Sequence, residues 1–116
     1  MEFSYSAKER DGICILDLKG NLMDRGQATD LLDEVENQIL NGITCFIVSM
    51  DEFKYMNSTG LNTLVTILTK SRKGGGDTVI CNIPPKINEL LLITKLNTVF
   101  SVCKNIEEAV RQFSKM

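Results

Sequence analysis

The residues best suited to chemistry are two adjacent hydroxyls in the run Met56-Asn57-Ser58-Thr59-Gly60. An apolar, β-branched stretch precedes this run and a helical repeat of leucines follows it, which predicts a strand-to-helix junction. Ligands and partners gather at such junctions in parallel α/β sheets. The positive end of a helix dipole favours negative charge, so Ser58 suits a phosphate. A hydroxyl that only caps the helix is the simpler interpretation, with Ser58 or Asn57 as the cap.

A second junction of the same kind is predicted at Met23-Asp24, where Asp24 is followed three residues later by Gln27, as in a capping box. Gly60 is unusual in the first turn of a helix, since glycine there costs up to about 1 kcal/mol relative to alanine. This predicts that Gly60 leaves room for the backbone of a partner to approach.

The composition excludes several kinds of function. There is no histidine, which removes the usual general base and the commonest zinc ligand, so we expect no enzyme activity and no cofactor. Thirteen basic residues against fifteen acidic ones give a net charge of −2, which is unlike a protein that binds nucleic acid. The four cysteines are widely spaced and never form C-x-x-C, so they are predicted to be reduced and mostly buried: Cys14, Cys45, Cys81 and Cys103.

The 116 residues are predicted to form one α/β domain, 1–116, with a mixed sheet flanked by about four helices. Asp11-Gly12 predicts an N-terminal hairpin, and βα units follow it. Asp51–Asn57 is expected to be a loop. The N-terminus lacks the pattern of a signal peptide and no apolar run is long enough to span a membrane, so we expect a cytoplasmic protein without a membrane partner. The expected strands are 3–8, 13–18, 43–50, 77–82 and 99–102, and the expected helices begin near residues 25, 58, 85 and 106.

Several segments, in order along the chain, resemble the STAS domain and in particular the bacterial anti-sigma factor antagonists. Tyr55-Met56-Asn57-Ser58-Thr59-Gly60-Leu61 is similar to that family's aspartate-serine-(serine or threonine)-glycine-leucine signature, with Asn57 in place of the aspartate. The other segments are Gly20-Asn21-Leu22-Met23-Asp24, Phe46-Ile47-Val48-Ser49-Met50, Cys81-Asn82-Ile83-Pro84-Pro85-Lys86-Ile87, Leu92-Ile93-Thr94-Lys95-Leu96 and Ile106-Glu107-Glu108-Ala109.

The resemblance implies a regulator that works by partner switching. It implies that the chain binds an anti-sigma factor with serine kinase activity, that the kinase phosphorylates Ser58 and ends the complex, and that a serine phosphatase reverses the change. Thr59 is the main rival as phosphoacceptor. The residues expected to contact the partner are Met23, Asp24, Met56, Asn57, Ser58, Thr59, Gly60 and Asn62.

Two other classes of function stay open. One is an accessory subunit of a transport complex that is not phosphorylated, a role that some single STAS domains have. The other is a small-ligand module that holds a nucleotide or an acyl group at the same junction. The intact serine-threonine-glycine run favours the partner-switching hypothesis over both.

Overall fold

The chain begins with the predicted β-hairpin. The computed structural model describes residues 2–114, in which β1 (Ser4–Arg10) pairs antiparallel with β2 (Ile13–Leu22). Asp11 and Gly12 form the turn, and both have positive φ angles, of 53° and 80°. A two-residue turn of this kind matches the twist of the flanking strands, which explains why an Asp-Gly pair stands here.

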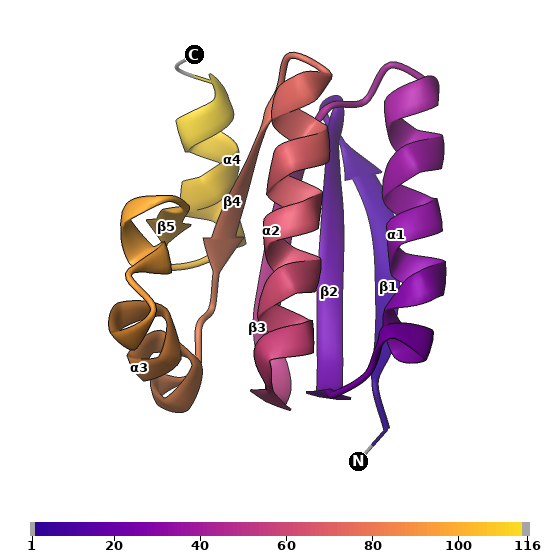
Figure 1. Cartoon of the computed structure of the whole chain (residues 1–116). Helices are drawn as coiled ribbons and strands as arrows, with labels where there is room; N and C mark the ends of the chain where they lie inside the picture. The colour runs from indigo at the N-terminus through magenta and orange to yellow at the C-terminus, as the bar shows by residue number, and fades with distance from the viewer. Residues whose placement is uncertain (1, 115–116) are drawn as a thin grey trace.

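Four βα units follow the first strand and complete the sheet in the order β1-β2-β3-β4-β5, with β2 to β5 parallel (Figure 1). The predicted order of strands and helices is confirmed. The remaining elements are α1 (Arg25–Leu40), β3 (Cys45–Met56), α2 (Ser58–Lys73), β4 (Asp77–Cys81), α3 (Pro85–Ile93), a short 3-10 helix η1 (Leu96–Thr98), β5 (Ser101–Cys103) and α4 (Ile106–Ser114).

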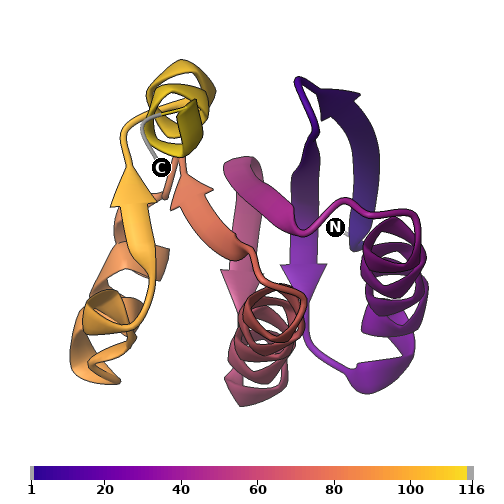
Figure 2. The same ribbon diagram turned by 90° about the horizontal axis from the view of Figure 1, so that it is seen from above.

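The helices cover the two faces of the sheet unequally. Helices α1, α2 and α3 lie on one face, and α4 lies on the other (Figure 2). The larger core therefore lies under α1 to α3 and includes Leu31, Leu64 and Leu91, while the smaller one lies under α4 and includes Ala109 and Val110. This arrangement confirms a mixed sheet flanked by helices.

Several predicted strand boundaries are wrong, among them the ends of β2 and β3 and the start of the last strand. The segment 51–57 was expected to be a loop, yet β3 continues to Met56 because β2 also continues to Leu22 and the two strands pair along this extension. Phe53 and Met56 in the extension are buried, which offsets the exposure of the polar residues between them. The last strand is Ser101–Cys103 rather than 99–102, because η1 and the turn after it occupy the preceding residues.

The four cysteines are free thiols, as predicted. Cys14, Cys81 and Cys103 are buried and Cys45 is partly buried. Burial raises the pKa of Cys14 to about 12 and that of Cys81 to about 11, so both are protonated and unreactive at neutral pH. Their role in this fold is that of small apolar side chains.

Candidate functional site

Two loops meet where β2 and β3 end. The strands are parallel and Leu22 pairs with Met56, so the chain leaves both strands at the same edge of the sheet and enters α1 and α2 there (Figure 1). The side-chain amide Nδ2 of Asn57 donates a hydrogen bond to the backbone oxygen of Met23, at 2.9 Å. We call residues 23–25 and 57–60 the capping corner, because each stretch holds the start of a helix.

Asp24 caps α1 with the predicted capping box. Its Oδ1 accepts the backbone N–H of Gln27 at 3.0 Å, and Gln27 Oε1 accepts the backbone N–H groups of Asp24 and Met23 at 3.1 and 2.8 Å. One carboxylate oxygen of Asp24 is thus committed to the helix start, although the residue is exposed. The loop 23–24 is therefore held in one conformation beside α2.

Asn57, not Ser58, caps α2. The Oδ1 of Asn57 accepts the backbone N–H groups of Thr59 at 3.0 Å and Gly60 at 3.3 Å. Ser58 is then the first residue of the helix, it is exposed, and its hydroxyl takes no part in the cap. The sequence left open whether Ser58 or Asn57 caps the helix. The structure assigns the cap to Asn57, so the Ser58 hydroxyl is not required to hold the helix start.

The amide of Asn57 does what an aspartate at this position would not do. Its oxygen caps α2 while its NH₂ group bonds to Met23, so one side chain joins the two loops of the capping corner. A carboxylate has only acceptors and would set one of them against the carbonyl oxygen of Met23. The departure from the signature sequence thus has a structural reason.

The predicted roles of Gly60 and Met56 as partner contacts require a correction. The expectation that Gly60 leaves room for a partner is wrong, because Gly60 is buried by this chain itself. A Cβ atom on Gly60 would lie 2.5 Å from the Cβ of Met56 and 2.8 Å from the carbonyl oxygen of Leu22. The absence of a side chain lets α2 pack closely on the ends of β2 and β3. Met56 is fully buried beneath it and is not accessible for direct contact.

The other predicted contact residues form the surface of the corner. Met23 is an exposed apolar residue, with 42% of its surface accessible. Asn57 and Thr59 are partly buried, while Asp24, Ser58 and Asn62 are exposed. The structure therefore brings an apolar side chain, a carboxylate and a free hydroxyl together on one surface.

A groove between α1 and α2 adjoins this surface, with a volume of about 420 Å³. The threonine hydroxyls at positions 29, 63 and 66 donate to backbone carbonyls one turn earlier in their own helices. The sequence predicted Thr59 and Asn62 as contact residues but not the other residues that line the groove. The repeat of threonines along α2 was the pattern that could have indicated them. The lining residues are Arg25, Ala28, Thr29, Leu32, Thr59, Asn62, Thr63 and Thr66.

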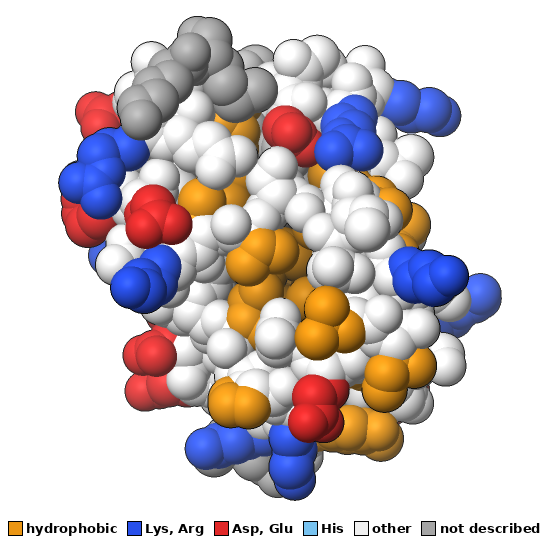
Figure 3. All heavy atoms as spheres, turned by 90° about the vertical axis from the view of Figure 1, so that its left-hand side faces the viewer, with side chains coloured by type: hydrophobic (Ala, Val, Ile, Leu, Met, Phe, Trp, Pro, Cys, Tyr) orange, Lys and Arg blue, Asp and Glu red, His pale blue; other side chains and the backbone are white. Residues whose placement is uncertain are grey.

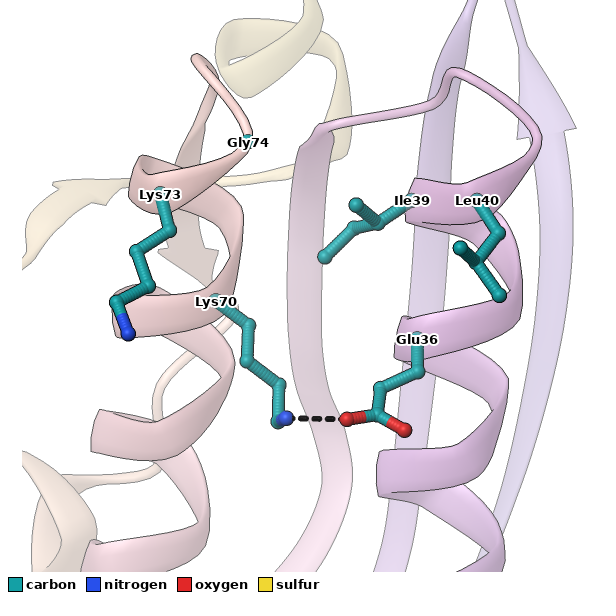
Figure 4. A pocket seen from close by; sticks show the side chains of 6 residues that line it. All are labelled: Glu36, Ile39, Leu40, Lys70, Lys73 and Gly74. Carbon is teal, nitrogen blue, oxygen red and sulfur yellow. Dashed lines mark hydrogen bonds and ion pairs between the residues drawn. The ribbon is translucent and has the colours of Figure 1, made fainter.

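Another hollow lies at the far ends of the same helices, around Ile39, Leu40, Glu36, Lys70 and Gly74 (Figure 4). Two of its three charged side chains, Lys70 and Glu36, are paired with each other across the helices, and Lys73 is the third. It holds no hydroxyl or thiol, so it offers no alternative hydroxyl for phosphorylation. It lies at the opposite ends of α1 and α2 from the capping corner, so it is not part of the candidate site.

Exposed apolar side chains also gather at the β5 edge of the molecule, which Figure 3 shows from the side of α3 and α4. They are Leu92, Ile93, Val99 and Val102, with exposures between 40% and 78%. This surface carries no group suited to chemistry. Within residues 2–114 there is no cluster of three or more potential metal ligands, and no described helix is long and apolar enough to cross a membrane.

The comparisons with known proteins agree with the fold. A family model described as the STAS domain matches residues 4–109. A protein of Bordetella bronchiseptica that carries the name anti-sigma factor antagonist BtrV is 25% identical over 103 residues, which cover 89% of this chain and 88% of the relative.

Solved structures of the same architecture include the Thermotoga maritima protein tm1081, with a TM-score of 0.84 and 20% identity over 93% of this chain and 92% of that one. The Bacillus cell fate determinant SpoIIAA in its phosphorylated form has a TM-score of 0.75 and 16% identity, over 95% of this chain and 99% of that one. At such identities these two show a shared fold. Since the family model spans nearly the whole sequence, the chain belongs to the STAS domain family.

Proposed function

We propose that this chain is a cytoplasmic anti-sigma factor antagonist, which binds an anti-sigma factor and is released when Ser58 is phosphorylated. The observation that carries the proposal is the exposed Ser58 hydroxyl at the first position of α2, left free because Asn57 makes the cap. The names of BtrV and of SpoIIAA in its phosphorylated form support the same role.

The chemistry belongs to the partner, which we propose to be a serine kinase. It would transfer the γ-phosphoryl group of ATP to the Oγ of Ser58, with loss of the hydroxyl proton and release of ADP. A serine phosphatase would return the hydroxyl by hydrolysis to inorganic phosphate. Ser58 is favoured over Thr59 because Ser58 is exposed, whereas Thr59 is partly buried and faces the groove between α1 and α2.

The partner would rest on the surface of the capping corner. Exposed Met23 would supply an apolar anchor, and Asp24, Asn57, Thr59 and Asn62 would supply polar contacts. The buried residues Met56 and Gly60 hold this surface from below. A phosphate brings about −1.5 to −2 charges into such a contact, where it must lose water or meet the partner's acidic groups.

Phosphopeptide mapping tests the proposal. The purified chain is incubated with ATP and a candidate serine-kinase anti-sigma factor from the same organism, and the labelled peptide is sequenced by mass spectrometry. We expect one phosphate on Ser58 and none in the Ser58→Ala variant, and any label on Thr59→Val should still lie on Ser58. Label on Thr59 would overturn the assignment. No label from an active kinase would favour the accessory subunit of a transport complex.

A further inference from the structure

We infer that Arg25 binds the phosphate carried by Ser58, in an ion pair that joins the start of α1 to the start of α2. This inference rests on the proposed function, because it requires the modification of Ser58. It adds a residue that neither the signature sequence nor the predicted contact surface includes.

The backbone of α2 is poorly placed to hold the phosphate unaided. A free helix start binds anions through its first N–H groups. Here Asn57 Oδ1 already accepts the N–H groups of Thr59 and Gly60, and the N–H of Leu61 donates to the carbonyl oxygen of Asn57. Only the N–H of Ser58 itself is left among the first four, so any further donor to a phosphate on Ser58 must come from a side chain.

Arg25 has the right position to supply that donor. It is the first residue of α1, as Ser58 is of α2, and the Asn57–Met23 hydrogen bond of 2.9 Å ties the two loops that precede them. Asn62, one turn after Ser58 on the same side of α2, lines the groove together with Arg25. Arg25 thus lines the groove together with Thr59, the residue that follows Ser58.

The charges around the groove leave Arg25 available. It forms no ion pair with any residue between 2 and 114, and it is the one charged residue among those that line the groove. Helix α2 has no charged side chain before Lys70. Asp24 is the other charge of the capping corner and it repels a phosphate, so the guanidinium of Arg25 is needed to offset it.

The ion pair would explain how one phosphate makes the proposed contact surface inaccessible to the partner. Arg25 and phosphorylated Ser58 would bridge the two helices across the mouth of the groove. The bridge would cover Thr59 and Asn62, which we propose as contacts for the partner. A guanidinium that forms two parallel hydrogen bonds to a phosphate is well suited to hold such a bridge.

The test uses the full chain with Ser58→phosphoserine installed during translation, which needs no kinase. Phosphorus NMR follows the loss of the second phosphate proton as the pH is raised. Arg25 favours the dianion, so Arg25→Gln should move this titration to higher pH by about half a unit at low salt. Arg25→Lys should keep most of the effect. Arg111→Gln, with the same charge change on α4 at the other face of the sheet, should leave the titration unchanged.

A second readout separates a direct bond from a general field effect. The Nε–H resonance of Arg25 should shift when Ser58 carries phosphate, while that of Arg111 should not. Equal titrations in the parent chain and Arg25→Gln, with an unmoved Arg25 resonance, would overturn the inference. Such a result would leave the proposed function intact, since kinase labelling of Ser58 is measured separately.

Discussion

Replacement of Asn57 tests the geometry of the capping corner most fully, since this side chain makes three hydrogen bonds there. In Asn57→Ala the cap is lost, which costs about 1 kcal/mol. The bond to the Met23 carbonyl is lost as well, which costs about another 1 kcal/mol, or less where water replaces it. We expect the free energy of unfolding to fall by about 1–2 kcal/mol.

Asn57→Asp separates the two roles of the side chain. The carboxylate keeps both capping acceptors and gains about 0.5 kcal/mol from the helix dipole. It loses the donor to Met23 and sets a charged oxygen against a carbonyl, which offsets that gain. We expect a stability between those of the parent chain and Asn57→Ala, within about 1 kcal/mol of the parent.

Urea unfolding followed by circular dichroism measures both variants. Asn88→Ala is the matched control, because Asn88 is an exposed helical asparagine on α3 and alanine there improves helix propensity. The Asn57→Ala loss should lower Tm by roughly 3–10 °C for a domain of this size. A stability of Asn57→Ala equal to that of Asn88→Ala, or an Asn57→Asp variant weaker than Asn57→Ala, would refute the reasoning.

Three further predictions concern the serine, the glycine and the thiols. Ser58→Asp should leave Tm nearly unchanged, because the helix start tolerates the charge, and should weaken anti-sigma factor binding in calorimetry; a large fall in Tm would contradict this. Gly60→Ala should cost about 1–3 kcal/mol by overpacking against Met56, while Gly26→Ala, whose added Cβ would lie 3.3 Å from its nearest neighbour, should be nearly neutral in the same thermal assay. Iodoacetamide at pH 8 should modify Cys45 well before Cys14. Since the folded Cys14 thiol has a raised pKa and the unfolded one ionises near 9, stability should also decline as the pH rises above about 9.

Local patterns were enough to predict much of this fold. The positive φ angles of Asp11 and Gly12 follow from the short-range chemistry of an Asp-Gly turn, and the Asp24–Gln27 capping box is visible from the spacing alone. The end of β3 was not predictable in the same way. Its polar residues resemble a loop, and only pairing with the extension of β2 makes them a strand.

The candidate site was predicted in part, because its serine lies in a motif and its neighbours do not. Gly60 was recognised as unusual from the sequence. The reason that a glycine stands there is the close approach of Leu22 and Met56 from two strands, which a linear pattern does not contain. Arg25 lines the same groove as Thr59 and Asn62 only because α1 and α2 start side by side. Contacts between distant segments of this kind require the tertiary structure.

The affinity of the anti-sigma factor for the two forms of Ser58 tests the central claim most directly. Isothermal titration calorimetry would compare the unmodified chain with the chain that carries Ser58→phosphoserine, in the same buffer and at physiological salt. The account predicts that phosphorylation weakens binding at least tenfold, which corresponds to about 1.4 kcal/mol, with no change in the fold by circular dichroism. Equal affinities of the two forms would contradict it.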